Sequence, residues 1–119
     1  MCGIVGLFLK DPALEPQLGK LLADMLVVMT GRGPDSAGFA VYGAGDAAHL
    51  KITLRGANLD AVEKGLAGIA KAHHRDTHLV LSFPASAEGQ VRGWLALNHP
   101  DLVVTGSGHR IELYKEVGL

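Results

Sequence analysis

Cysteine is scarce in this sequence, which has 119 residues and a single cysteine, Cys2. No internal disulfide can form, which excludes a disulfide-stabilised secreted scaffold and favours a reducing compartment. Long hydrophobic runs are also missing, because no apolar stretch approaches the roughly 20 residues that span a bilayer. The apolar run from Ile4 to Leu9 is too short for a signal peptide and follows no basic segment. We therefore expect a cytoplasmic protein without a membrane segment.

An excess of charge of one sign is absent as well. The chain has 11 Lys and Arg residues against 12 Asp and Glu residues, which gives a formal net charge of −1. Because no basic cluster is present to neutralise phosphates, we expect no binding to nucleic acid or to a membrane surface. Apolar residues make up 48% of the sequence, enough for one core. Glycine is abundant, at 16 residues, and predicts tight turns and close backbone approaches.

Hydrophobic patterning predicts a strand, a helix and a hairpin in the first half. The apolar residues of 2–9 predict a buried strand. Apolar residues at three- and four-residue steps then predict a helix over 14–29, on one face of which lie Leu14, Leu18, Leu21, Leu22, Met25, Leu26 and Met29. The Thr-Gly-Arg-Gly-Pro sequence of 30–34 ends that helix. Strands are expected over 36–42 and 48–54, paired with each other across a Gly-Ala-Gly-Asp turn.

The second half alternates between helices and strands. We expect a helix over 59–70 with Asn58 as its N-cap, and Trp94 in the core. The remaining expected elements are a strand over 78–83, a helix over 88–97, and strands over 102–105 and 110–115 separated by a Gly106-Ser107-Gly108 turn. This order favours a small α/β unit with some parallel pairing.

Cys2 is the residue with the most distinctive chemistry. Removal of Met1 would leave Cys2 with both a thiol and a free α-amine. An α-amine ordinarily has a pKa of about 7.7–8.0, so it can act as a general base near neutral pH. A thiol with a pKa of about 8.5 needs little help to become a thiolate, so nucleophile and base can share one residue. A structural cysteine near the chain start is the alternative interpretation.

The surrounding motifs favour the nucleophile. The start Cys2-Gly3-Ile4-Val5-Gly6, followed by a helix and then Arg32-Gly33-Pro34-Asp35-Ser36-Ala37-Gly38, resembles the class II (N-terminal-nucleophile) glutamine amidotransferases. That family includes glucosamine-6-phosphate synthase, amidophosphoribosyltransferase, asparagine synthetase and glutamate synthase. The stretch 106–118 looks like the amidotransferase subunits associated with glutamate synthase and N-methylglutamate synthase.

The resemblance implies a fold and a reaction. The fold would be α+β, with residues 1–55 forming the N-terminal part of an αββα sandwich. Residues 56–119 would be a small alternating α/β unit, either an insertion in that domain or its continuation. Cys2 would attack the side-chain amide of glutamine, release ammonia and form a γ-glutamyl thioester that water then hydrolyses. The ammonia acceptor would be a synthase subunit. This chain itself would hold no cofactor or metal, and any FMN or iron–sulfur cluster would belong to the partner.

The resemblance also places Arg32, Gly33, Asp35 and Ser36 in a loop beside the nucleophile. Arg32 would support this loop through its fork of donors, or it would interact with the last carbonyls of the preceding helix. Asp35 would have a role in the site, or it would bond backbone amides of the turn. The presence of glycine at position 33 is better explained by the backbone geometry of a turn than by a chemical role in the site.

The sequence departs from the family in the segments that handle substrate. We find no His-Thr-Arg segment to hold the glutamine carboxylate, no acidic residue to bind its amine, and no Asn-Gly pair for the oxyanion; Asn98 is followed by His99. We therefore expect a poor glutaminase alone, and a piece of a longer or split protein whose open sheet edge favours self-association into homo-oligomers. The alternatives are a non-catalytic binding or assembly module and an N-terminal-nucleophile hydrolase that acts on another amide.

Two further patterns favour ordinary structural roles. His73, His74 and His78 suggest a metal cluster, but no cysteine accompanies them and their spacing matches no ligand pair on a helix, so we expect a solvated loop. Gly106-Ser107-Gly108 is expected to form a turn and not a phosphate-binding loop.

Overall fold

A computed structural model describes residues 3–32 and 36–117. The chain divides into two compact units, residues 1–37 with 116–119, and residues 38–115. Within residues 3–32 and 36–117, no helix has the length and hydrophobicity of a membrane-spanning segment.

The first unit is dominated by one helix. A 3₁₀ segment, η1 (Pro12–Gln17), begins where the Asp11 side chain accepts a hydrogen bond from the Ala13 amide at 3.0 Å. The helix α1 (Leu18–Val28) follows, and a 3₁₀ turn, η2 (Thr30–Arg32), comes after it. The predicted apolar face is confirmed from residue 18 on, because the half-buried residues there are Leu18, Leu21, Leu22, Met25, Leu26 and Met29. Leu14, expected on the same face, lies in η1 and is exposed.

The strand predicted over residues 2–9 is wrong for the residues that the structure describes. Residues 3–9 form no strand, and Ile4 and Phe8 are 92% and 86% exposed. Their apolar character predicted burial, but burial of a strand needs a neighbouring strand, and none of the described strands pairs with this segment.

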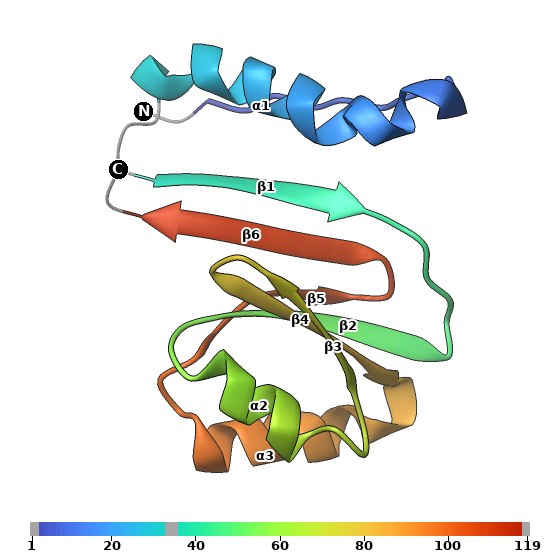
Figure 1. The fold of residues 1–119 in the computed structure, drawn as a ribbon, viewed down its shortest axis with the longest axis vertical. Helices are drawn as coiled ribbons and strands as arrows, with labels where there is room; N and C mark the ends of the chain where they lie inside the picture. The colour runs from blue at the N-terminus through green and yellow to red at the C-terminus, as the bar shows by residue number, and fades with distance from the viewer. Residues whose placement is uncertain (1–2, 33–35, 118–119) are drawn as a thin grey trace. The chain divides into compact units, whose positions relative to one another are not determined.

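The second unit is built on a four-stranded antiparallel sheet in the order β3-β4-β2-β5. Its strands are β2 (His49–Arg55), β3 (Lys71–Arg75), β4 (His78–Pro84) and β5 (Val103–Gly108). Two helices, α2 (Leu59–Gly65) and α3 (Glu88–Asn98), lie together on one side of this sheet (Figure 1). The 3₁₀ turn η3 (Ala85–Ala87) leads into α3. Helices gathered on one face of an antiparallel sheet are an α+β arrangement.

Strand alternation places the core between this sheet and the helices. Residues of alternate positions on β2 and β4 face the same side, where Ile52 pairs with Leu81 and Leu54 with Leu79. The buried cluster consists of Ile52, Leu54, Val62, Leu66, Ala70, Leu79, Leu81, Phe83, Val91 and Leu95. Trp94, expected in the core, is half-buried and packs against this cluster.

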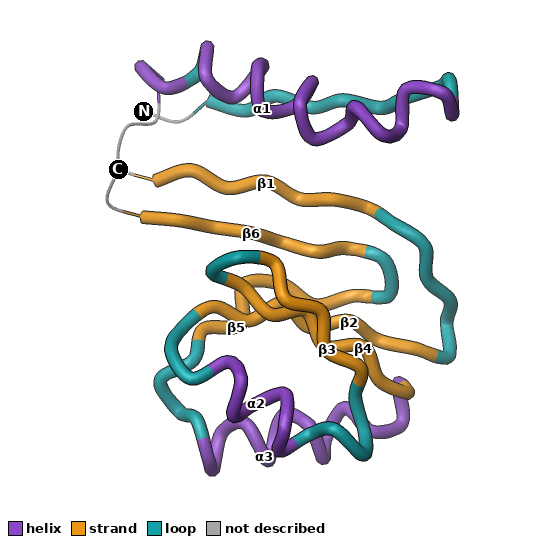
Figure 2. The backbone as a smooth tube through the Cα atoms, in the orientation of Figure 1, coloured by secondary structure: helices purple, strands orange, loops and turns teal. Residues whose placement is uncertain are grey.

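The other face of the sheet meets a two-stranded sheet formed by β1 (Ser36–Tyr42) and β6 (Ile111–Val117), which run side by side (Figure 2). Side chains satisfy backbone groups of β6. Thr53 accepts a hydrogen bond from the Leu113 amide at 3.3 Å, and Arg55 donates one to the Lys115 carbonyl at 3.0 Å. His78 Nε2 accepts from the Lys115 amide at 3.1 Å. Polar side chains thus take the place of a neighbouring strand along part of β6.

Several predictions about strand pairing are wrong. Strands form close to 36–42 and 48–54, but they do not pair as a hairpin, because β1 pairs with β6 while β2 pairs with β4 and β5. The pairs of the four-stranded sheet are antiparallel, so the second half contains no parallel α/β unit among its described strands. The alternation of Leu50, Ile52 and Leu54 in the sequence indicates which side chains of β2 lie on one face, and these face the core, but it carries no information about which strand lies beside β2.

The second half also differs in its boundaries. The helix predicted over 59–70 ends at Gly65, and the polar segment 71–75, expected as a loop, is β3. Asn58 does precede α2, but it adopts a left-handed conformation (φ 62°) and its side chain makes no capping hydrogen bond. Gly106 and Gly108 lie within β5 and not in a turn. A Cβ on Gly106 would lie 2.6 Å from that of Leu113, so glycine at this position allows β5 and β6 to approach closely.

Candidate functional site

Three of the five residues expected at the active site lie outside the described residues: Cys2, Gly33 and Asp35. Arg32 is the last residue of η2, and Ser36 is the half-buried first residue of β1. The helix end before the expected loop is well defined, since the Thr30 hydroxyl donates to the Val27 carbonyl at 2.8 Å. The roles of these five residues therefore stay predictions.

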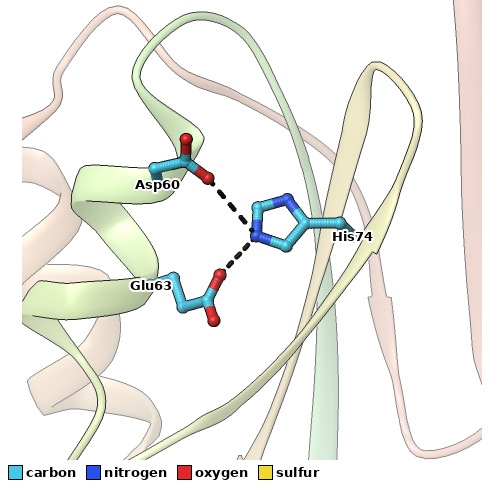
Figure 3. Close-up of side chains that lie close together, drawn as sticks. All are labelled: Asp60, Glu63 and His74. Atoms are coloured by element: carbon cyan, nitrogen blue, oxygen red, sulfur yellow. Dashed lines mark hydrogen bonds and ion pairs between the residues drawn. The ribbon is translucent and has the colours of Figure 1, made fainter.

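A different group of chemically active side chains comes together in the second unit. Asp60, Glu63 and His74 each offer one ligand atom, and these three atoms lie within 4.8 Å of one another (Figure 3). His74 Nε2 forms a short contact with Glu63 Oε2 and lies 3.6 Å from Asp60 Oδ1. Among the described residues, this is the one group of three or more His, Cys, Asp or Glu side chains close enough to hold a metal ion.

Local structure explains how residues from two elements meet here. Asp60 and Glu63 are three residues apart in α2 and therefore share one helix face. On β3 the side chains alternate, so His74 lies on the same face as Ala72, which packs against the core beneath the helices. His73 consequently lies on the opposite face. The alternation of β3 is what directs one imidazole, and not its neighbour, toward α2.

The group borders an open depression with a volume of about 870 Å³. Asp60 and His74 line it together with the cationic side chains of Arg55 and Lys64 and with Asp76. The side chains of Asp60, Glu63 and His74 are 89%, 44% and 43% exposed. These groups are therefore open to solvent and to small solutes.

A second polar group links the two sheets. Lys51 Nζ on β2 lies 3.2 Å from Glu112 Oε2 on β6, and the Tyr114 hydroxyl donates to Glu112 Oε1 at 2.5 Å. Burial alone would raise the pKa of Glu112, but the hydrogen bonds from Tyr114 and Lys51 outweigh it and hold that pKa below its ordinary value. Burial and the bond to Glu112 raise the pKa of Tyr114. Since the members bind one another, this group serves to join β2 and β6.

The histidines do not form the cluster that their spacing suggested. His78 is buried and bonded to the Lys115 amide, and it shares a hydrogen bond of 2.9 Å with Thr77. His74 instead meets two carboxylates that the sequence analysis did not single out. The Asp-x-x-Glu spacing in α2 was the available signal, but nothing in the sequence pairs α2 with residue 74, because β3 was not recognised as a strand.

Comparison with known proteins gives two relatives. The chain is 48% identical over 126 residues to the glutamine amidotransferase-like protein GlxB of Rhizobium meliloti, covering 100% of this chain and 42% of that protein. It is 51% identical over 43 residues to a putative glutamine amidotransferase of Methanothermobacter thermautotrophicus, covering 36% of this chain and 14% of that protein. No protein-family model and no solved structure matches the chain.

The chain spans less than half the length of the curated relatives that it matches. The names of both relatives agree with the resemblance that the N-terminal motifs carry. The similarity to GlxB extends beyond those motifs over the whole chain and so includes the second unit. These similarities support a relationship between this chain and the glutamine amidotransferases.

Proposed function

We propose that this chain is the nucleophile-bearing part of a class II glutamine amidotransferase that hydrolyses the side-chain amide of glutamine. The observation that supports this most directly is the 48% identity to a glutamine amidotransferase-like protein over the whole chain, combined with cysteine at position 2. A remaining part of the protein would provide the glutamine clamp and the oxyanion donors, because the 119 residues contain neither a His-Thr-Arg segment nor an Asn-Gly pair.

The proposed reaction starts once Met1 has been removed. The neutral α-amine of Cys2 takes the thiol proton, and the thiolate attacks the amide carbon of glutamine. The tetrahedral intermediate collapses as the protonated amine donates a proton to the leaving nitrogen, which releases ammonia and leaves a γ-glutamyl thioester. Water, activated by the same amine, then attacks the thioester, releases glutamate and restores the thiol.

We further propose that Arg32, Gly33, Asp35 and Ser36 form a loop that supports Cys2 within an αββα sandwich, and that the reaction takes place in the reducing cytoplasm. The ammonia would pass to a glutamate-synthase-like partner, and any flavin or iron–sulfur chemistry would be that partner's. The order of the elements supports this proposal, since α1 ends at Val28 and β1 begins at Ser36.

A non-catalytic assembly module is the second candidate function. It is favoured by the absence of the substrate-handling motifs from these 119 residues. Such a module would keep the fold of the second unit and would have no use for the Cys2 thiol.

Mass spectrometry and a glutaminase assay on the longest natural form of the protein separate these functions. We expect the intact mass to lack Met1, glutamine to yield glutamate and ammonia, and a glutamine analogue with an alkylating diazoketone to add to Cys2. Cys2→Ala should abolish both hydrolysis and labelling, while Ser107→Ala on β5 serves as a control that retains them. Retention of Met1, or hydrolysis that survives Cys2→Ala, would contradict the proposed nucleophile.

A further inference from the structure

We propose that Asp60, Glu63 and His74 form a binding site for a divalent transition-metal cation, for which Zn²⁺ is the probe. This site goes beyond the proposed glutaminase reaction and does not depend on it. It rests on the meeting of two carboxylates from α2 with one imidazole from β3 (Figure 3).

The donor atoms fit such an ion. Zn²⁺ binds imidazole nitrogen and carboxylate oxygen at about 2.0–2.2 Å in a tetrahedral arrangement, which places neighbouring ligand atoms about 3.3–3.6 Å apart. His74 Nε2 and Asp60 Oδ1 are 3.6 Å apart. Glu63 Oε2 already contacts the same Nε2 atom, so a cation that displaces the Nε2 proton needs only small side-chain rotations to reach all three ligands.

The kind of ion follows from the kind of ligand. Imidazole suits Zn²⁺, Ni²⁺, Cu²⁺ and Fe²⁺, whereas Mg²⁺ and Ca²⁺ prefer oxygen ligands alone. Arg55 and Lys64 line the same depression and reduce its negative potential, so net charge by itself would not retain a hard cation there. His74 is therefore the residue that selects a transition metal over Mg²⁺.

The fold fixes the two elements that carry the three ligands before any ion binds. Val62 between the carboxylates is fully buried, and Ala72, two residues before His74, packs against the same core. α2 and β3 are thus fixed by the cluster beneath them. Three protein ligands leave a fourth position toward the open depression, where water or a small anion can bind, as in zinc sites that are not closed by the protein.

Calorimetric titration with Zn²⁺ after chelator treatment tests this site. It is carried out in a Cys2→Ala background, so that the thiol contributes no binding. We expect one Zn²⁺ per chain, and at least about tenfold weaker binding in His74→Ala and Glu63→Gln, since even changes outside the first ligand sphere weaken metal affinity about 10–100-fold. His73→Ala is the matched control and should bind as the parent does, because His73 is exposed on the opposite face of β3.

Two further measurements separate a metal site from a simple ion pair. Zn²⁺ should raise the melting temperature of the parent and of His73→Ala but not of His74→Ala, since an ion that binds only the folded state stabilises it. In nuclear magnetic resonance spectra the ring signals of His74 should shift with Zn²⁺ before those of His73. Absence of Zn²⁺ binding by the parent, equal binding by His74→Ala, or equal loss in His73→Ala would each overturn the proposal.

Discussion

Gly65 shows how one residue sets the spacing between α2 and α3. A Cβ on Gly65 would lie 2.2 Å from Cζ2 of Trp94, which packs against the core. Gly65→Ala should therefore lower the free energy of unfolding by about 1–3 kcal/mol despite the better helix propensity of alanine. Gly93→Ala is the matched control, because α3 offers open space there, and it should raise stability by about 0.5–1 kcal/mol. Urea unfolding of both variants is the measurement, and equal shifts would contradict this packing.

Single residues also show which structural roles could be predicted from the sequence and which could not. Trp94 was expected in the core because it lies in a short apolar segment, and it packs against the core cluster. Gly65 lies within the helix predicted over 59–70, where glycine lowers helix propensity, and in the fold it admits the Trp94 ring. Asp60 and Glu63 share a helix face that their spacing indicates, but their meeting with His74 depends on tertiary contacts between α2 and β3. The helix face on which a residue lies follows from the local sequence, whereas a contact between α2 and β3 follows only from the fold.

The strand β6 depends on hydrogen bonds with polar side chains of other strands. Thr53 is fully buried and accepts a hydrogen bond from the Leu113 amide. Thr53→Val keeps the shape but leaves that amide without its acceptor, which should cost about 1–3 kcal/mol of stability. Hydrogen exchange should show the largest loss of protection at the Leu113 amide. Thr53→Ser retains the hydroxyl, so protection at Leu113 should largely survive; equal loss in both variants would count against the hydrogen bond.

Several elements were predicted close to their observed bounds. β1 was expected over 36–42 and forms over Ser36–Tyr42, and α3 was expected over 88–97 and forms over Glu88–Asn98. The helix expected over 14–29 begins as the 3₁₀ segment η1 and continues as α1. β3 was missed because its sequence, Lys-Ala-His-His-Arg, is polar and has one apolar residue that faces the core. β1 and β2 were located but were expected to pair with each other, whereas β1 pairs with β6. The polar side chains of β2, Lys51, Thr53 and Arg55, contact β6 instead. Alternation predicts the faces of a strand and not its partner.

At the scale of the whole molecule, burial is distributed unevenly along the chain. The fully buried residues lie in the unit of residues 38–115, whereas α1 has no buried residue. Segments with few buried contacts open at low free-energy cost, and proteolysis reports such opening.

We expect trypsin to cut the native chain after Lys20 in α1 well before it cuts after Lys64 in α2, although both side chains are exposed. The difference should arise because α2 is fixed by the buried Val62. Mass spectrometry of timed digests gives the two rates, and heat-unfolded protein is the control that gives the intrinsic ratio of cleavage at the two sites. Equal rates in the native protein would mean that α1 is held as firmly as α2, and that burial within each unit does not govern local opening in this chain.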